Sequence, residues 1–166
     1  ENIYMTGFGY AVAITNACDD ISIKDNVFRV KGRHYVSTGA GTGSRDSGGF
    51  VRNIRILNNT FENCTQEAIN THPPFIGPIE IIGNTFNYCG KGIEISNGNT
   101  VIVDNVFIEC PIGIQLLGDE RRTHEIHSNE FKGYIEKIII ETQNITVRGN
   151  ICNGKFRINK NEIEFL

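Results

Sequence analysis

The sequence predicts an all-β fold, a right-handed single-stranded parallel β-helix of about six coils. A phrase that reads apolar, any, apolar, any, any, Asn, any, Phe recurs six times, three of them in variant form, around Asn26, Asn59, Asn84, Asn105, Asn129 and Asn150. The intervals between these asparagines are 33, 25, 21, 24 and 21 residues, and a period in the twenties is typical of solenoids. Apolar and polar residues alternate on both sides of each Asn, which predicts short strands with one buried face. Coils wound in one direction pair such strands in parallel.

The repeated Asn and Phe are expected to form two columns in the coil stack. Asn tolerates the left-handed backbone region that tight turns need, so we expect it at a turn between strands. Stacked one per coil, the amides can hydrogen-bond along the column and satisfy polar groups that face inward. The Phe two residues later points into the same interior, and its rings should stack.

Three of the five cysteines predict a further column. Cys64, Cys89 and Cys110 each lie five residues after their Asn, and Cys152 stands where the other repeats have Phe. Free Cys behaves as a small buried hydrophobe, so we expect inward-facing thiols, with disulfides as the less favoured alternative. The sequence contains no CxxC pair and predicts no metal site.

Composition limits the function classes. The 166 residues carry 19 acidic and 16 basic side chains, a net charge of −3, and no Trp. Without a basic stripe the sequence predicts no nucleic-acid partner. Apolar runs stay well below the roughly 18 residues of a membrane span, so no membrane partner is expected. The repeat is already present at residues 13–16 without an amphipathic capping helix before it. Since solenoid ends need caps, we expect residues 1–166 to be one β-helix domain from a longer protein, or one member of an oligomer such as a homotrimer.

Insertions point to one corner of the helix. The second strand of each repeat aligns on Ile14, Val36, Ile69, Ile93, Ile114 and Ile138. The longest connections after these positions are residues 37–53 and 70–78, and a shorter insertion follows Ile114. Because loops on a rigid scaffold carry function, we expect the site beside them. On this alignment an outward polar column contains Ser37, Asn70, Glu94 and Gln115.

The predicted catalytic residues are His72, Glu94 and His34. His72 is the expected acid or base near neutral pH, and Glu94 is expected to orient it. The structural alternative is that His34 covers a strand edge and His72 hydrogen-bonds within its Pro-rich turn. His124 and His127 stand within the repeat and are expected to be structural.

The predicted substrate-binding residues surround this pair of histidines. Arg33 and Arg45 are expected to hold an anionic group of the substrate, because guanidinium groups match carboxylate and phosphate geometry. Asp46, Asn70 and Gln115 complete the predicted set.

The six repeat units resemble the right-handed β-helix repeats of the pectate-lyase-like superfamily over essentially the whole chain. That superfamily includes pectate lyases, polygalacturonases, alginate lyases and phage tail spikes. The signatures of its best-known enzymes are missing, because no Gly-His-Gly follows Asp19-Asp20 and a chain without Trp lacks the Trp-Ile-Asp-His segment of pectate lyases. No catalytic residue is therefore carried over by position. The segments 32–34 and 70–72 are similar to arrangements in phage-borne β-helix proteins, which implies a trimeric tail spike or appendage.

The expected function is a module, extracellular or on a virion, that binds a bacterial surface polysaccharide or teichoic acid and in an enzymatic form depolymerises it. One alternative is a secreted polysaccharide lyase acting on uronic-acid polymers with Ca²⁺, although the sequence shows no clear Ca²⁺ site and Asp19-Asp20 is better explained as a polar turn. The other alternative is a non-catalytic structural or glycan-binding solenoid.

Overall fold

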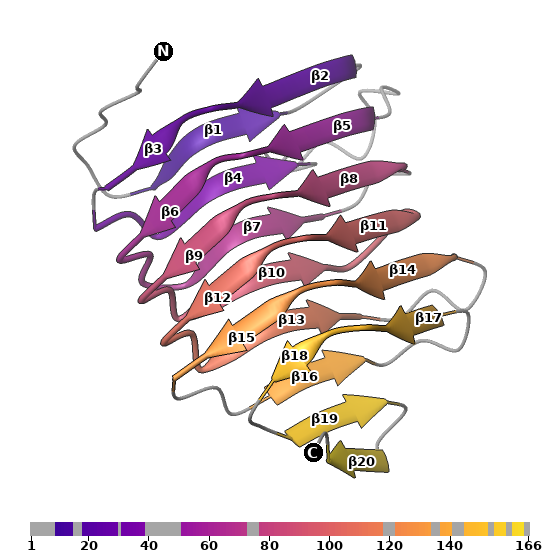
Figure 1. Ribbon diagram of the computed structural model, residues 1–166. Helices are drawn as coiled ribbons and strands as arrows, with labels where there is room; N and C mark the ends of the chain where they lie inside the picture. Colours follow the sequence, from indigo (N-terminus) through magenta and orange to yellow (C-terminus); the bar gives the residue numbers. More distant parts are fainter. Residues whose placement is uncertain are drawn as a thin grey trace.

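The strands of the chain stack as successive turns of a solenoid (Figure 1). The computed structural model describes residues 9–14, 18–29, 31–38, 51–72, 77–117, 122–133, 137–140, 145–152, 155–158 and 161–164. All regular secondary structure in these segments is β-strand, so the predicted all-β class is confirmed. In the same segments no helix is long and apolar enough to cross a membrane.

Three sheets share the strands. Sheet A has eight strands, in the order β1 (Tyr10–Ile14), β4 (His34–Thr38), β7 (Glu67–Thr71), β10 (Lys91–Ile95), β13 (Ile112–Leu116), β16 (Lys137–Ile140), β19 (Lys155–Ile158) and β20 (Asn161–Glu164). Sheet B has six, β2 (Asp19–Lys24), β5 (Arg52–Leu57), β8 (Ile79–Ile82), β11 (Thr100–Val103), β14 (His124–His127) and β17 (Ile145–Arg148). Sheet C has six, β3 (Val27–Phe28), β6 (Thr60–Glu62), β9 (Thr85–Asn87), β12 (Val106–Ile108), β15 (Glu130–Lys132) and β18 (Ile151–Cys152).

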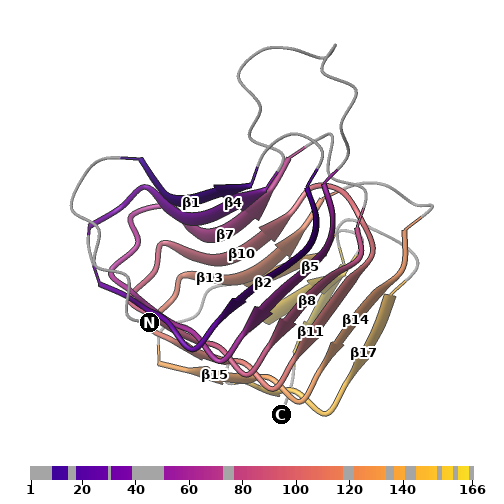
Figure 2. The same ribbon diagram turned by 90° about the horizontal axis from the view of Figure 1, so that it is seen from above.

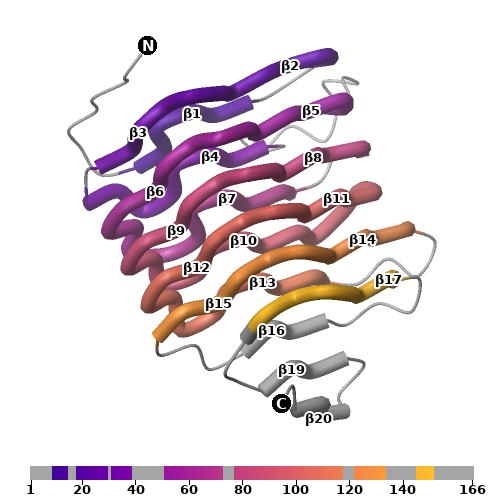
Figure 3. The backbone as a smooth tube through the Cα atoms, in the orientation of Figure 1, coloured from indigo at the N-terminus to yellow at the C-terminus, as the bar shows by residue number. Residues whose placement is uncertain are grey.

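The chain visits the three sheets in a fixed order. It runs from sheet A to sheet B to sheet C and then enters sheet A again one coil further on, as the view from above shows (Figure 2). The tube trace in Figure 3 follows the same winding. Neighbouring strands in all three sheets are parallel, except for the antiparallel pair β19 and β20. This topology is the predicted parallel β-solenoid, while its right-handed sense stays a prediction.

The asparagine column is a continuous hydrogen-bonded ladder. The Nδ2 group of each ladder Asn donates to Oδ1 of the next, at 3.2 Å from Asn26 to Asn59 and 3.1 Å from Asn59 to Asn84. The pattern continues through Asn105 and Asn129 to Asn150. The same Oδ1 atoms also accept from backbone N–H groups, for example from Asn59 to Asn84 at 2.8 Å. The predicted ladder is confirmed, and it satisfies buried polar groups at the bend between sheets B and C.

The left-handed residue of each turn is not the ladder Asn, contrary to the prediction. It is the residue before it, with φ between 53° and 67°, at Asp25, Asn58, Gly83, Asp104, Ser128 and Gly149. The ladder Asn needs an extended backbone so that its amide lies parallel to the stack. The preceding residue reverses the chain, and the short polar residues and glycines found there tolerate positive φ.

Aromatic rings fill the interior beside the ladder. Phe28, Phe61, Phe86, Phe107 and Phe131 stack with ring centroids 4.7 to 5.1 Å apart, as predicted. This stack requires small residues on the facing strands of sheet A. A Cβ atom on Gly92 would lie 2.6 Å from both Phe107 Cε1 and the carbonyl oxygen of Gly113. The Gly-Ile pairs of the repeat therefore exist because the rings occupy the space of a side chain.

The cysteine column is buried and carries free thiols, as predicted. Cys64, Cys89 and Cys110 are at most 2% exposed. Their thiols donate to carbonyl oxygens of the preceding coil, such as Cys89 Sγ to Phe61 O at 3.5 Å. Burial raises the pKa of the Cys64 thiol to about 12. These thiols are packing groups and stay protonated.

Candidate functional site

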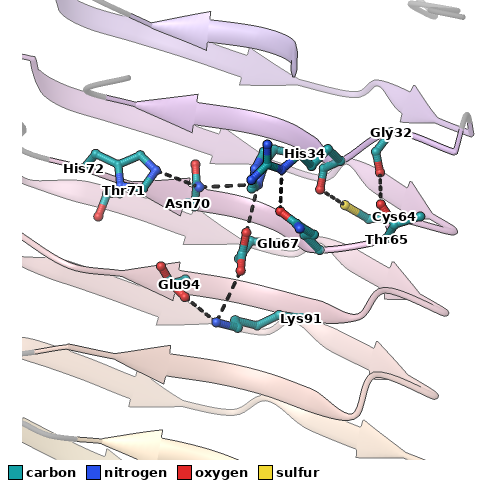
Figure 4. A network of polar contacts seen from close by, with 12 residues as sticks. Gly32, His34, Cys64, Thr65, Glu67, Asn70, Thr71, His72, Lys91 and Glu94 are labelled. Carbon is teal, nitrogen blue, oxygen red and sulfur yellow. Dashed lines mark hydrogen bonds and ion pairs between the residues drawn. The ribbon is translucent and has the colours of Figure 1, made fainter. Parts of the chain in front are cut away.

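Two columns of side chains face outward from sheet A. The register of β4, β7, β10 and β13 aligns Ser37, Asn70, Glu94 and Gln115, as the sequence alignment predicted. A second column lies three residues earlier along each strand and contains Tyr10, His34, Glu67, Lys91 and Ile112. Figure 4 shows how the polar members of the two columns meet. We call His34, Glu67, Asn70, His72, Lys91 and Glu94 the sheet A cluster.

Glu67 links two coils within this cluster. Its Oε2 lies 2.9 Å from Nδ1 of His34, and its Oε1 lies 3.4 Å from Nζ of Lys91. Lys91 forms a second ion pair with Glu94. The side chains of Glu67, Lys91 and Glu94 are only 14 to 17% exposed, so these charges are held in fixed positions. One ammonium thus neutralises part of two carboxylates.

His34 is a neutral imidazole with a defined tautomer. Burial lowers the pKa of His34, and the Glu67 carboxylate opposes this effect. The neutral ring carries its hydrogen on Nδ1, where it donates to Glu67, and its Nε2 is left as an acceptor. The ring stacks on Tyr10, with centroids 5.1 Å apart and planes 15° apart.

Asn70 connects His34 to His72. Its Nδ2 lies 3.0 Å from Nε2 of His72 and 3.4 Å from Nδ1 of His34. Because Glu67 takes the Nδ1 hydrogen of His34, the Asn70 amide donates to His72. The backbone N–H of His72 donates to Thr38 O at 2.8 Å, which fixes the start of the loop that follows β7.

Buried polar atoms in this cluster lack partners. Among the described residues, Oδ1 of Asn70 and Oγ of Ser37 have no hydrogen-bond partner. Both residues lie on the outer face of sheet A, yet Asn70 is 1% and Ser37 0% exposed. A buried acceptor without a partner costs about 1 to 3 kcal/mol, so these atoms favour any ligand that supplies donors.

The predicted pairing of His72 with Glu94 is not what the structure contains. Glu94 pairs with Lys91, while His72 contacts Asn70. The lysine three residues before Glu94 on the same face provides an opposite charge at shorter reach. The carboxylate that orients a histidine is Glu67, and the histidine is His34.

The other predicted residues are spread more widely. The Nε group of Arg33 donates to Gln66 Oε1 at 2.7 Å. Gln115 is half-buried beside Glu94 in the register. Arg45 and Asp46 lie outside the described residues.

Sequence reasoning missed Glu67, Lys91 and Tyr10. The signal was available, because these residues stand two positions before the aligned Ile69 and Ile93, and four positions before Ile14 in the first strand. Attention to histidines and insertions left this second outward column unexamined.

Asp19 and Asp20 form ion pairs at the edge of sheet B. Asp19 contacts Arg52 at 2.8 Å and Asn53 at 2.6 Å, and Asp20 pairs with Arg55. The hydrogen bond from Arg52 is the largest influence that lowers the pKa of Asp19. These contacts agree with a polar turn.

Comparison with known proteins adds a family to this geometry. Residues 2–156 match a family described as periplasmic copper-binding protein (NosD). The chain belongs to the NosD family. Membership and the parallel sheets together support the predicted β-helix repeat protein, whereas kinship with pectate lyases or tail spikes gains no support. The NosD family is described as periplasmic, which agrees with a location outside the cytoplasm and not with a virion in particular. No curated protein matches the chain, and no solved structure matches it.

Proposed function

We propose that the chain is a saccharide-binding β-solenoid of the periplasm, with its site on the outer face of sheet A. The observation that carries the proposal is the pair of unpartnered buried atoms, Asn70 Oδ1 and Ser37 Oγ, beside His34 and His72. Saccharide hydroxyl groups can donate and accept, so they can complete both atoms at once. Such convergent polar groups are typical of binding sites.

The solenoid suits an elongated ligand. Equivalent positions on successive coils repeat at about 4.8 Å, so a chain molecule laid along the stack meets the same column several times. The column Ser37, Asn70, Glu94 and Gln115 offers polar groups on four successive strands of sheet A. The expected surface polysaccharide or teichoic acid is one such polymer, and the phage tail-spike form of this expectation has no support beyond the resemblance.

Cleavage of the polymer is a second candidate function, favoured by the His34–Glu67 pair. A carboxylate 2.9 Å from Nδ1 orients the imidazole and leaves Nε2 to take a proton. The lowered pKa of His34 keeps it in the base form at neutral pH. In this scheme Glu67 is a positioning residue and His34 the base, in place of His72 and Glu94. Product release that is lost in His34→Ala but retained in His72→Ala would support it.

Copper, which the family description names, does not fit the described residues. In the segments that the structure describes, no group of three or more His, Cys, Asp or Glu side chains could hold a metal ion. The soft thiolate donors that copper prefers are represented by Cys64, Cys89 and Cys110, which are buried and donate to carbonyl oxygens. The site on sheet A consists of amide, hydroxyl and paired charged groups. We therefore derive no step through a metal.

Binding of oligosaccharides tests the proposal. Isothermal titration of the chain with a mixed set of hexasaccharides should give saturable binding that Asn70→Ala and Ser37→Ala each weaken about tenfold. Ser22→Ala is the matched control, because Ser22 is exposed on β2 of sheet B, away from sheet A. Absence of binding to every hexasaccharide, or equal loss in the control, would contradict the proposed function.

A further inference from the structure

We infer that the ligand of the sheet A cluster is an uncharged saccharide and not the anionic polymer expected from the sequence. This inference rests on the saccharide-binding function proposed above and narrows its substrate class. Three features of the cluster lead to it: the state of its cations, the direction of its free hydrogen bonds and the exposed ring beside it.

The cations of this face are already engaged. Lys91 lies between the carboxylates of Glu67 and Glu94, and its side chain is 14% exposed. Arg33, the nearest guanidinium, donates to Gln66. Two carboxylates, one ammonium and one guanidinium with a neutral His34 leave no net positive charge among the described groups. An anionic polymer would have to break these pairs and lie against Glu67 and Glu94, which costs free energy.

The free hydrogen-bonding positions also exclude anionic groups as partners. Asn70 Oδ1 can only accept, and Nε2 of His34 can only accept while Nδ1 carries the hydrogen toward Glu67. Ser37 Oγ can donate or accept. An ionised carboxylate or phosphate oxygen has no hydrogen to donate to the two acceptors. A hydroxyl group has one, so a hydroxyl-rich uncharged sugar complements all three positions.

Tyr10 provides the apolar part of such a site. One face of its ring covers His34, and the residue is still 47% exposed. An aromatic ring beside fixed polar groups matches a sugar, which has an apolar C–H face and a polar rim. Tyr10 lies on β1, one coil before His34, so ring and acceptors line the same stretch of sheet A.

Hexasaccharides of equal length and different charge test the ligand class. Cellohexaose and N-acetylchitohexaose represent uncharged sugars, hexagalacturonate the anionic class and glucosamine hexamer the cationic class. At least one uncharged hexamer should bind about tenfold more tightly than both charged hexamers, with little change on adding salt. Asn70→Ala and Tyr10→Ala should weaken that binding, while Ser22→Ala should not. Circular dichroism melts show that each variant is folded.

The outcomes separate the two proposals. Tighter binding of hexagalacturonate or glucosamine hexamer, lost in Asn70→Ala, would overturn the uncharged class and leave saccharide binding intact. Binding of an uncharged hexamer that Asn70→Ala does not change would overturn the site, and no binding at all would overturn both. If Asn70→Ala does not fold, Ser37→Ala and Tyr10→Ala decide the question in the same way.

Discussion

Oε2 of Glu67 lies 2.9 Å from Nδ1 of His34, although 33 residues separate the two in the sequence. The contact joins β7 to β4 across a coil boundary and sets the tautomer of the imidazole. Because the same carboxylate reaches Lys91 on the next coil, one side chain connects three turns of the solenoid.

Replacing Glu67 by Gln should lower the pKa of His34 further. The Gln oxygen can still accept from Nδ1–H, but it removes the negative charge that stabilises the imidazolium form. A proton NMR titration of the His34 ring measures this pKa. Glu94→Gln is the control, since Glu94 pairs with Lys91, and it should leave the His34 titration unchanged. A raised or unaltered pKa in Glu67→Gln would contradict the assignment.

Acid should destabilise the fold through His124. Burial lowers its folded-state pKa from 6.5 to about 4, so the unfolded chain binds the proton more readily between these values. The stability due to this group is complete above pH 6.5 and falls by roughly 3 kcal/mol as the pH approaches 4. Urea denaturation at several pH values measures it.

Thr supplies the control for this pH effect, since Thr100 occupies the register position of His124 one coil earlier. His34 and the carboxylates contribute equally to the wild type and to His124→Thr, so their difference isolates His124. A pH dependence in His124→Thr as steep as in the wild type would show that His124 is not the source.

Removing one amide from the middle of the ladder should be costly. In Asn84→Ala the backbone N–H and Nδ2 of Asn59 lose their acceptor, and the carbonyls of Ile56 and Ile82 lose their donor. We expect a loss of about 2 to 4 kcal/mol in the free energy of unfolding. Asn87→Ala, three residues away, removes a side chain whose Oδ1 has no partner among the described residues and should cost under about 1 kcal/mol. Equal losses would refute the role given to the ladder.

A single methyl group at Gly92 should destabilise the ring stack. Its Cβ would lie 2.6 Å from Phe107 Cε1 and from Gly113 O, so ring and backbone must both move. Gly92→Ala should therefore cost about 2 kcal/mol or more in a thermal or urea unfolding experiment. Gly32→Ala meets only the Tyr35 ring at 3.2 Å and should cost less than about 1 kcal/mol. A Gly92→Ala variant as stable as wild type would disprove this account of the Gly-Ile pairs.

The repeat itself could be predicted from the sequence, because each copy carries the same residues at the same spacing. Asn, Phe and Cys recur at fixed offsets, and their ladder, stack and thiol column follow directly. The turn residue before each Asn could not be recognised in this way, since it varies between Asp, Asn, Gly and Ser. These residues share a tolerance of positive φ and not a side chain.

The site could be predicted only in part, because the sequence gives the register of a column but not the choice of partner within it. Aligning the apolar residues was enough to bring Ser37, Asn70 and Glu94 together. Which carboxylate meets which histidine depends on competition with Lys91, and that competition is decided by side-chain reach in space. The alignment therefore placed Glu94 correctly and assigned it the wrong partner.

The amide ladder has one more consequence, which concerns direction. Every Nδ2 group donates toward the following coil, from Asn26 through Asn129 to Asn150. Backbone dipoles in a sheet largely cancel, but these side-chain dipoles all add, with the negative end at Asn26 and the positive end at Asn150. The coil stack is thus an electrically polar rod, and the two opposite orientations of a chain molecule laid along it are not equivalent in energy.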